Sequence, residues 1–154
     1  MRFYWDTCIF ISWLKNENIK PGLLEGIEEI VKQVDKKEIE IITSVLTHTE
    51  MLRGKFTDNN FEMFKSLFKR PNIVDCEVTG HIAEVAGEIR NYYSNSLSTP
   101  DAIHLATAIV YEVDEMHTSD GSGKKNGLIQ YSGMVADKFN ITIKEPLGVQ
   151  YNLL

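Results

Sequence analysis

The feature that most constrains the fold is the alternation of short, strongly apolar segments with longer segments of helical periodicity. The apolar segments predict buried strands at 2–5, 39–43, 73–74, 115–118 and 141–143. Apolar residues recur every three or four positions in the predicted helices, at 9–14, 22–36, 45–55, 61–68, 82–93, 101–111 and 135–139. Strands that alternate with helices favour a sheet covered on both faces. We therefore expect an α/β protein, a three-layer α/β/α sandwich around a central, mostly parallel sheet of about four or five strands.

Length and composition favour one ordinary domain. The chain has 154 residues, 43% hydrophobic and 25% charged, which is typical of a soluble globular protein. We expect residues 1–145 to form the domain and 146–154 to form a C-terminal tail. No apolar run could cross a bilayer, and Asp6 interrupts the first apolar segment where a secretory signal would continue. The predictions are therefore no membrane association and a cytoplasmic location, which the two cysteines, Cys8 and Cys76, also fit.

Three carboxylates come shortly after predicted strands. Asp6 directly follows the first strand, Glu50 comes after the strand at 39–43, and Asp120 follows the strand at 115–118. In an open α/β sheet, ligands bind beyond the carboxyl ends of the strands. We therefore expect these three acids to converge at one edge of the sheet. Asp101 opens the predicted helix at 101–111 and joins them if that helix begins at the same edge.

Each acid alone has a simpler structural explanation. Asp6 could cap a helix, and Glu50 could complete a capping box if its helix began near Thr47. Asp101 follows a good helix start, and Asp120 precedes a glycine in a turn. Several carboxylates at one place repel each other, however, and a bound cation relieves that repulsion. Oxygen ligands without paired histidine or cysteine suit Mg²⁺ or Mn²⁺, which can activate water for phosphoryl chemistry. The predicted metal ligands and catalytic residues are Asp6, Glu50, Asp101 and Asp120.

The segments that carry these acids resemble those of PIN-domain nucleases, in the same order and over nearly the whole chain. They are residues 4–10 (YWDTCIF), 41–52 (IITSVLTHTEML), 98–108 (STPDAIHLATA) and 117–120 (HTSD). The resemblance, to the VapC-like toxin ribonucleases of this family, implies a PIN-like fold and a metal-dependent endoribonuclease with an RNA substrate. It also implies a homodimer, and a toxin whose antitoxin is a separate protein. Following the family pattern, four hydroxyl side chains beside the acids could orient carboxylates or water, or could serve ordinary turns: Thr7, Ser44, Thr118 and Ser119.

The charge of the chain argues in the opposite direction. The formal net charge of −6 is unusual for an enzyme that binds nucleic acid, because phosphate contacts normally require a basic surface. Basic residues that flank the predicted site and could hold RNA phosphates are Arg53, Lys55, Lys124 and Lys125.

Two other functions are alternatives to the nuclease. A phosphatase or phosphorylated receiver would need a second aspartate two residues after Asp6, where Cys8 stands. A non-catalytic PIN-fold module that binds RNA or protein stays open, and metal-dependent cleavage distinguishes it from the enzyme. His104 lies one helical turn after Asp101 and could approach the site, although a buried, hydrogen-bonded histidine is the expected role.

Overall fold

The central layer of the protein is a parallel sheet. The computed structural model describes residues 1–17, 20–51, 57–119 and 127–148. Within these ranges the five-stranded sheet has the order β3-β2-β1-β4-β7, and each neighbouring pair is parallel. Its strands are β1 (Arg2–Trp5), β2 (Glu40–Ser44), β3 (Ile73–Cys76), β4 (Glu115–His117) and β7 (Ile143–Lys144). The parallel sheet predicted from the sequence is confirmed.

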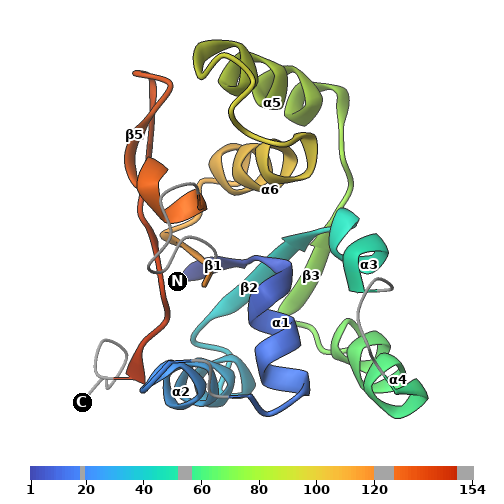
Figure 1. Ribbon diagram of the computed structural model, residues 1–154. Helices are drawn as coiled ribbons and strands as arrows, with labels where there is room; N and C mark the ends of the chain where they lie inside the picture. Colours follow the sequence, from blue (N-terminus) through green and yellow to red (C-terminus); the bar gives the residue numbers. More distant parts are fainter. Residues whose placement is uncertain (18–19, 52–56, 120–126, 149–154) are drawn as a thin grey trace.

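Helices cover both faces of this sheet (Figure 1). On one face lie α1 (Thr7–Leu14), α2 (Leu23–Asp35) and α4 (Asp58–Leu67), with the short α3 (Leu46–Met51) adding Met51 to the same apolar cluster. On the other face lie α5 (Gly80–Tyr92) and α6 (Thr99–Val110). The fold is therefore the expected three-layer α/β/α sandwich.

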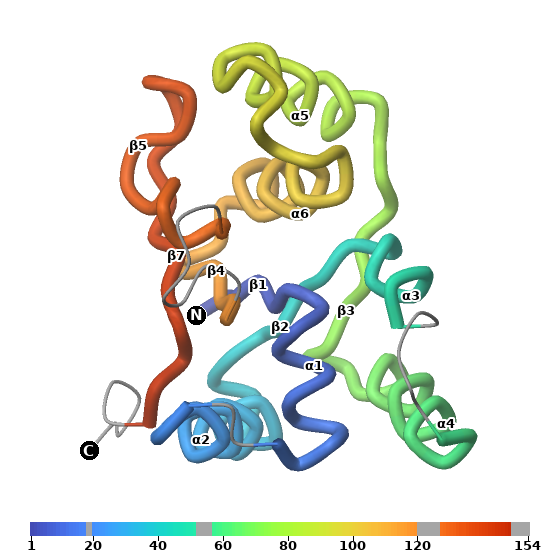
Figure 2. The backbone as a smooth tube through the Cα atoms, viewed as in Figure 1, coloured from blue at the N-terminus to red at the C-terminus, as the bar shows by residue number. Residues whose placement is uncertain are grey.

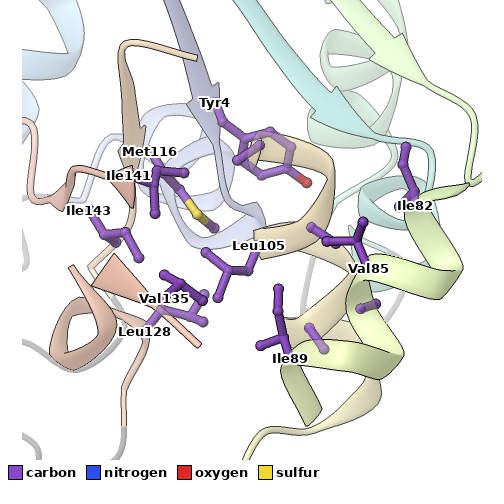
Figure 3. Packing of buried hydrophobic residues seen from close by; sticks show 14 of the residues in the cluster. Tyr4, Ile82, Val85, Ile89, Leu105, Met116, Leu128, Val135, Ile141 and Ile143 are labelled. Carbon is purple, nitrogen blue, oxygen red and sulfur yellow. The ribbon is translucent and has the colours of Figure 1, made fainter. Parts of the chain in front are cut away.

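The two apolar cores follow from the alternation of side chains along each strand. Phe3 and Trp5 point into the cluster beneath α1 and α2, whereas Tyr4 points into the cluster beneath α5 and α6. Figure 3 shows Tyr4 in the second cluster together with Leu105 of α6 and Met116 of β4. Because both faces of the sheet are covered, the buried residues of β1 are all apolar or aromatic instead of alternating with polar ones.

The order of the strands creates a switch point at the centre of the sheet. From β1 the chain builds β2 and β3 on one side, then passes through α5 and α6 and adds β4 on the other side of β1 (Figure 2). Asp6 follows β1 and Thr118 follows β4, so both lie where neighbouring strands end. A switch point of this kind is the usual place for a ligand in an open α/β sheet.

The predicted helix at 135–139 is wrong. This segment is a hairpin in which β5 (Gly133–Val135) pairs antiparallel with β6 (Phe139–Ile141). The turn residues Ala136 and Asp137 have φ of 51° and 54°, a conformation whose twist suits a tight hairpin. The predicted last strand at 141–143 is divided between β6 and β7, and a 3₁₀ helix, η1 (Leu128–Tyr131), precedes the hairpin.

Part of the predicted C-terminal tail packs against α2. A Cβ added to Gly26 would lie 1.7 Å from the carbonyl oxygen of Pro146, and the N–H of Gly148 donates to the carbonyl of Gly22 at 2.9 Å. Glycine at position 26 therefore lets the chain after β7 approach the helix backbone closely. The rest of the predicted tail, 149–154, lies outside the described residues. None of the helices described is long and apolar enough to span a bilayer.

Candidate active site

Asp6 is held at the switch point by both of its carboxylate oxygens. Oδ1 accepts the backbone N–H of Thr7 at 2.8 Å, so Asp6 caps α1, and Oδ2 accepts the hydroxyl of Thr118 at 3.0 Å. The residue is buried, at 7% exposure. Burial raises the pKa of Asp6, and the charge of Glu50 adds to this, while His104 and the two hydrogen bonds act in the opposite direction. Asp6 therefore both caps α1 and belongs to the group of carboxylates.

Glu50 approaches Asp6 from α3. The Thr7 hydroxyl donates to Glu50 Oε1 at 3.0 Å, while the backbone N–H of the same threonine donates to Asp6. The Glu50 side chain retains 24% exposure. Thr7 therefore bridges two carboxylates that come from different elements, as expected for a residue that orients the site.

His104, which belongs to α6, lies beside both acids. Its Nε2 forms a hydrogen bond with Glu50 Oε1 and lies 3.8 Å from Asp6 Oδ1, and its Nδ1 forms a hydrogen bond with the Tyr4 hydroxyl. Burial lowers the pKa of His104, but the carboxylates of Glu50, Asp6 and Asp101 outweigh it, so that the pKa is raised. The residue is fully buried and hydrogen-bonded, and it also reaches the site, so both expectations from the sequence hold.

Asp101 lies at the same edge as Asp6. It is in the first turn of α6, where its N–H donates to the Ser98 hydroxyl oxygen at 3.3 Å, and its charge acts on His104 one turn later. Figure 2 shows the N-terminal end of α6 on the side of the sheet that carries α3. The helix that carries Asp101 therefore begins at the edge that the prediction for Asp101 requires.

The remaining predicted residues divide into two groups. Ser44 contributes its N–H to the Tyr4 hydroxyl and its side chain to the start of α3, and Ser119 contacts Cys8 rather than an acid. Outside the described residues lie Asp120 and the basic residues Arg53, Lys55, Lys124 and Lys125.

Two contributors were not found from the sequence. Tyr4 was read only as part of a buried strand, although a buried tyrosine hydroxyl needs a polar partner. No sequence motif points to Cys8 as a contact of the acids, but its Sγ lies 3.8 Å from Asp6 Oδ2 and 3.4 Å from Thr118 Oγ1. Burial, followed by the charge of Asp6, raises the pKa of Cys8 to about 12, so the thiol keeps its proton.

The donor chemistry of the site fits a hard divalent cation. The carboxylates of Asp6 and Glu50 approach each other through Thr7 and His104, and oxygen donors of this kind suit Mg²⁺ or Mn²⁺. Among the residues that the structure describes, no three histidine, cysteine, aspartate or glutamate side chains gather closely enough to hold a metal ion.

A comparison with protein families gives a match to the PIN domain over residues 3–125. The chain belongs to the PIN domain family. The matched region of this PIN domain begins within β1 and contains all four predicted acids, and the β5–β6 hairpin and β7 follow it.

Solved structures show the same PIN fold. One similar chain is from VapBC2 of Rickettsia felis bound to a DNA fragment from their promoter, with a TM-score of 0.65 and 13% identity. The similarity covers 93% of this chain and 97% of that one. Another is from a toxin–antitoxin complex of Klebsiella pneumoniae, with a TM-score of 0.55, 23% identity, and coverage of 93% and 96%. No curated protein matches the sequence of this PIN domain significantly.

Proposed function

We propose that this PIN domain is a divalent-metal-dependent endoribonuclease whose catalytic, metal-binding carboxylates are Asp6, Glu50, Asp101 and Asp120. The observation that carries the proposal is that Asp6 and Glu50, from separate elements, are held together at the switch point by Thr7. Burial and a neighbouring carboxylate both penalise ionised Asp6, and a cation would offset that penalty.

The side chains at this edge could support hydrolysis of an RNA phosphodiester bond. Mg²⁺ or Mn²⁺, when bound, supplies positive charge at the phosphate and lowers the pKa of water. Asp6 is fixed by Thr7 and Thr118 and would hold the cation, and Asp101 approaches from α6. Glu50 retains partial exposure, so its carboxylate can orient the attacking water and accept its proton. Since water attacks, the products carry 5′-phosphate and 3′-hydroxyl ends.

The reaction is tested with purified protein and total cellular RNA. Cleavage is expected in Mn²⁺ or Mg²⁺ and not in EDTA, with the stated ends identified by end-labelling. Cleavage that persists in EDTA, or that leaves 2′,3′-cyclic phosphates, would exclude this chemistry. If total RNA is not cleaved at all, the protein is better described as a non-catalytic PIN-fold module that binds RNA or protein.

We further propose that the protein is the toxin of a toxin–antitoxin pair, active on RNA in the cytoplasm. Support comes from two structural neighbours, one named VapBC2 and one a toxin–antitoxin complex, that align with 93% of this chain. Expression should arrest growth, and co-expression of a small protein encoded beside it should restore growth. Absence of toxicity from a protein that cleaves RNA in vitro would contradict this part of the proposal.

The family resemblance also supports a homodimer. Sedimentation should give a dimer at about tens of micromolar, a range suited to weak association. A monomer under those conditions would refute this assembly without affecting the proposed chemistry.

A further inference from the structure

We propose that His104 is a positioning residue for Glu50, and that it is itself held by Tyr4. Together they form a relay of hydrogen bonds that runs from the backbone of β2 through Tyr4 and His104 to the Glu50 carboxylate. This inference rests on the proposed function, because it explains how one of the proposed catalytic acids is kept in place.

The direction of the relay follows from its two ends. The backbone N–H of Ser44 can only donate, and it donates to the Tyr4 hydroxyl oxygen at 3.0 Å. At the other end an ionised carboxylate can only accept, so His104 Nε2 donates to Glu50 Oε1. In the neutral imidazole Nδ1 is then the acceptor, and it receives the Tyr4 hydroxyl proton. The relay thus presents a donor, rather than an acceptor, to the carboxylate.

The relay is shielded from water along most of its length. Ser44, Tyr4 and His104 are all fully buried. Hydrogen bonds in a low-dielectric interior are stronger and polarise one another, and water does not compete for the same groups. Tyr4 is also fixed by its strand, since its backbone pairs with Ile42 of β2 and Met116 of β4. The relay therefore begins in buried, paired strands and ends at a partly exposed carboxylate.

Glu50 lies near the end of a short helix, and partners from other elements hold its carboxylate. α3 has six residues, and Glu50 is the second to last of them. A glutamate has three side-chain torsions to fix, and the partners that hold Oε1 come from other elements, Thr7 of α1 and His104 of α6. His104 is also one turn after Asp101, so it ties the position of Glu50 to the helix that carries a second proposed ligand.

Two substitutions at position 104 separate a positioning role from a purely structural one. The amide of His104→Gln can reach the place of Nε2 and donate to Glu50, whereas the amide of His104→Asn reaches only the place of Nδ1, near Tyr4. Partners behind metal ligands typically contribute 10–100-fold to metal affinity or activity. We expect His104→Asn to weaken Mn²⁺ binding and to lower kcat about tenfold or more, with little change in KM for RNA. His104→Gln should stay within a few-fold of the wild type.

Mn²⁺ affinity is measured by isothermal titration calorimetry without RNA, and melting temperatures are recorded in EDTA. Tyr4→Phe removes the hydroxyl that orients His104 and should weaken Mn²⁺ binding several-fold. Its matched control is Tyr93→Phe, because the Tyr93 hydroxyl also accepts a backbone N–H, that of Ala136 at 2.8 Å, away from the acids. The control should lose stability without losing Mn²⁺ affinity.

The outcomes distinguish the relay from the proposed function. If the wild type neither binds Mn²⁺ nor cleaves RNA, the proposed function is wrong and the relay with it. If the wild type does both, but His104→Asn and His104→Gln bind Mn²⁺ equally well, His104 is only structural. Should His104→Asn fail to fold, equal Mn²⁺ affinity of Tyr4→Phe and Tyr93→Phe would overturn the relay instead.

Discussion

Replacement of Asp6 by asparagine should remove metal binding and cleavage while preserving the fold. Asparagine caps helices about as well as aspartate, so its Oδ1 can still accept the N–H of Thr7. Its amide N–H can donate to the Thr118 hydroxyl, which can act as acceptor as well as donor. The substitution also removes a buried charge that burial and Glu50 penalise. In EDTA the free energy of unfolding should therefore change by less than about 1 kcal/mol, or increase.

With metal present the two proteins should differ strongly. A ligand at 100 times its Kd stabilises a protein by about 2.7 kcal/mol, which corresponds to roughly 5–10 °C in Tm for a chain of this length. We expect Mn²⁺ to raise the Tm of the wild type by this amount and to leave that of Asp6→Asn almost unchanged. Cleavage should fall more than about 100-fold, since the loss of a ligand should exceed the effect of a residue behind it.

The assay is a thermal melt with Mn²⁺ titrated from zero, together with cleavage of total RNA at saturating metal. Asp6→Ala is the comparison variant, because it removes the cap and should cost about 1 kcal/mol in EDTA. The reasoning is refuted if Asp6→Asn keeps the Mn²⁺-dependent increase in Tm or cleaves RNA at the rate of the wild type.

Three further predictions concern separate features. Because the folded-state pKa of Asp6 is raised, its ionised form costs stability above that pKa, and the cost disappears as pH falls toward the ordinary value of 3.8. The stability of wild type relative to Asp6→Asn in EDTA should therefore increase as pH is lowered from 7, and no change in denaturant melts would contradict the raised pKa. Gly26→Ala should destabilise the protein by about 1–3 kcal/mol, because its Cβ would meet the Pro146 carbonyl, whereas Gly87→Ala in α5 has open space and should stabilise it by about 0.5–1 kcal/mol. Equal Tm values for the two glycine variants would disprove the close packing at α2. Cys8, with a pKa raised to about 12, should react with iodoacetamide at pH 8 far more slowly than a free thiol, and rapid labelling by mass spectrometry would contradict this.

The sequence by itself determined the layers and the place of the site. Short apolar runs such as 3–5, alternating with helical segments, favoured covered, parallel strands, and these residues are buried in β1. Asp6 could then be placed at the carboxyl end of a strand without any coordinates, because the strand ended at a charged residue. Glu50 and Asp101 were predicted from their positions after a strand and at a helix start, and the PIN domain resemblance supported both through short motifs around each acid. For Asp120 the sequence remains the sole basis of the prediction.

The local pattern did not determine the segment around 133–141. Its short apolar spacing fits a helix turn as well as a strand, and the outcome depended on two turn residues, Ala136 and Asp137, adopting positive φ. Without a glycine at either position, the sequence carries little signal for that conformation. In the structure β5 pairs with β6 in a separate two-stranded sheet, and β7 then joins β4 in the main sheet.

Only the tertiary structure decided how the acids are connected. Tyr4 and His104 are 100 residues apart in sequence, and their hydrogen bond depends on how α6 crosses the sheet above β1. The same crossing brings His104 to Glu50 and places Asp101 at the edge that carries Asp6. Sequence periodicity indicates which face of a helix is buried, but not which end of it lies at a given edge of the sheet. That direction is set by the packing of whole helices, which no local pattern encodes.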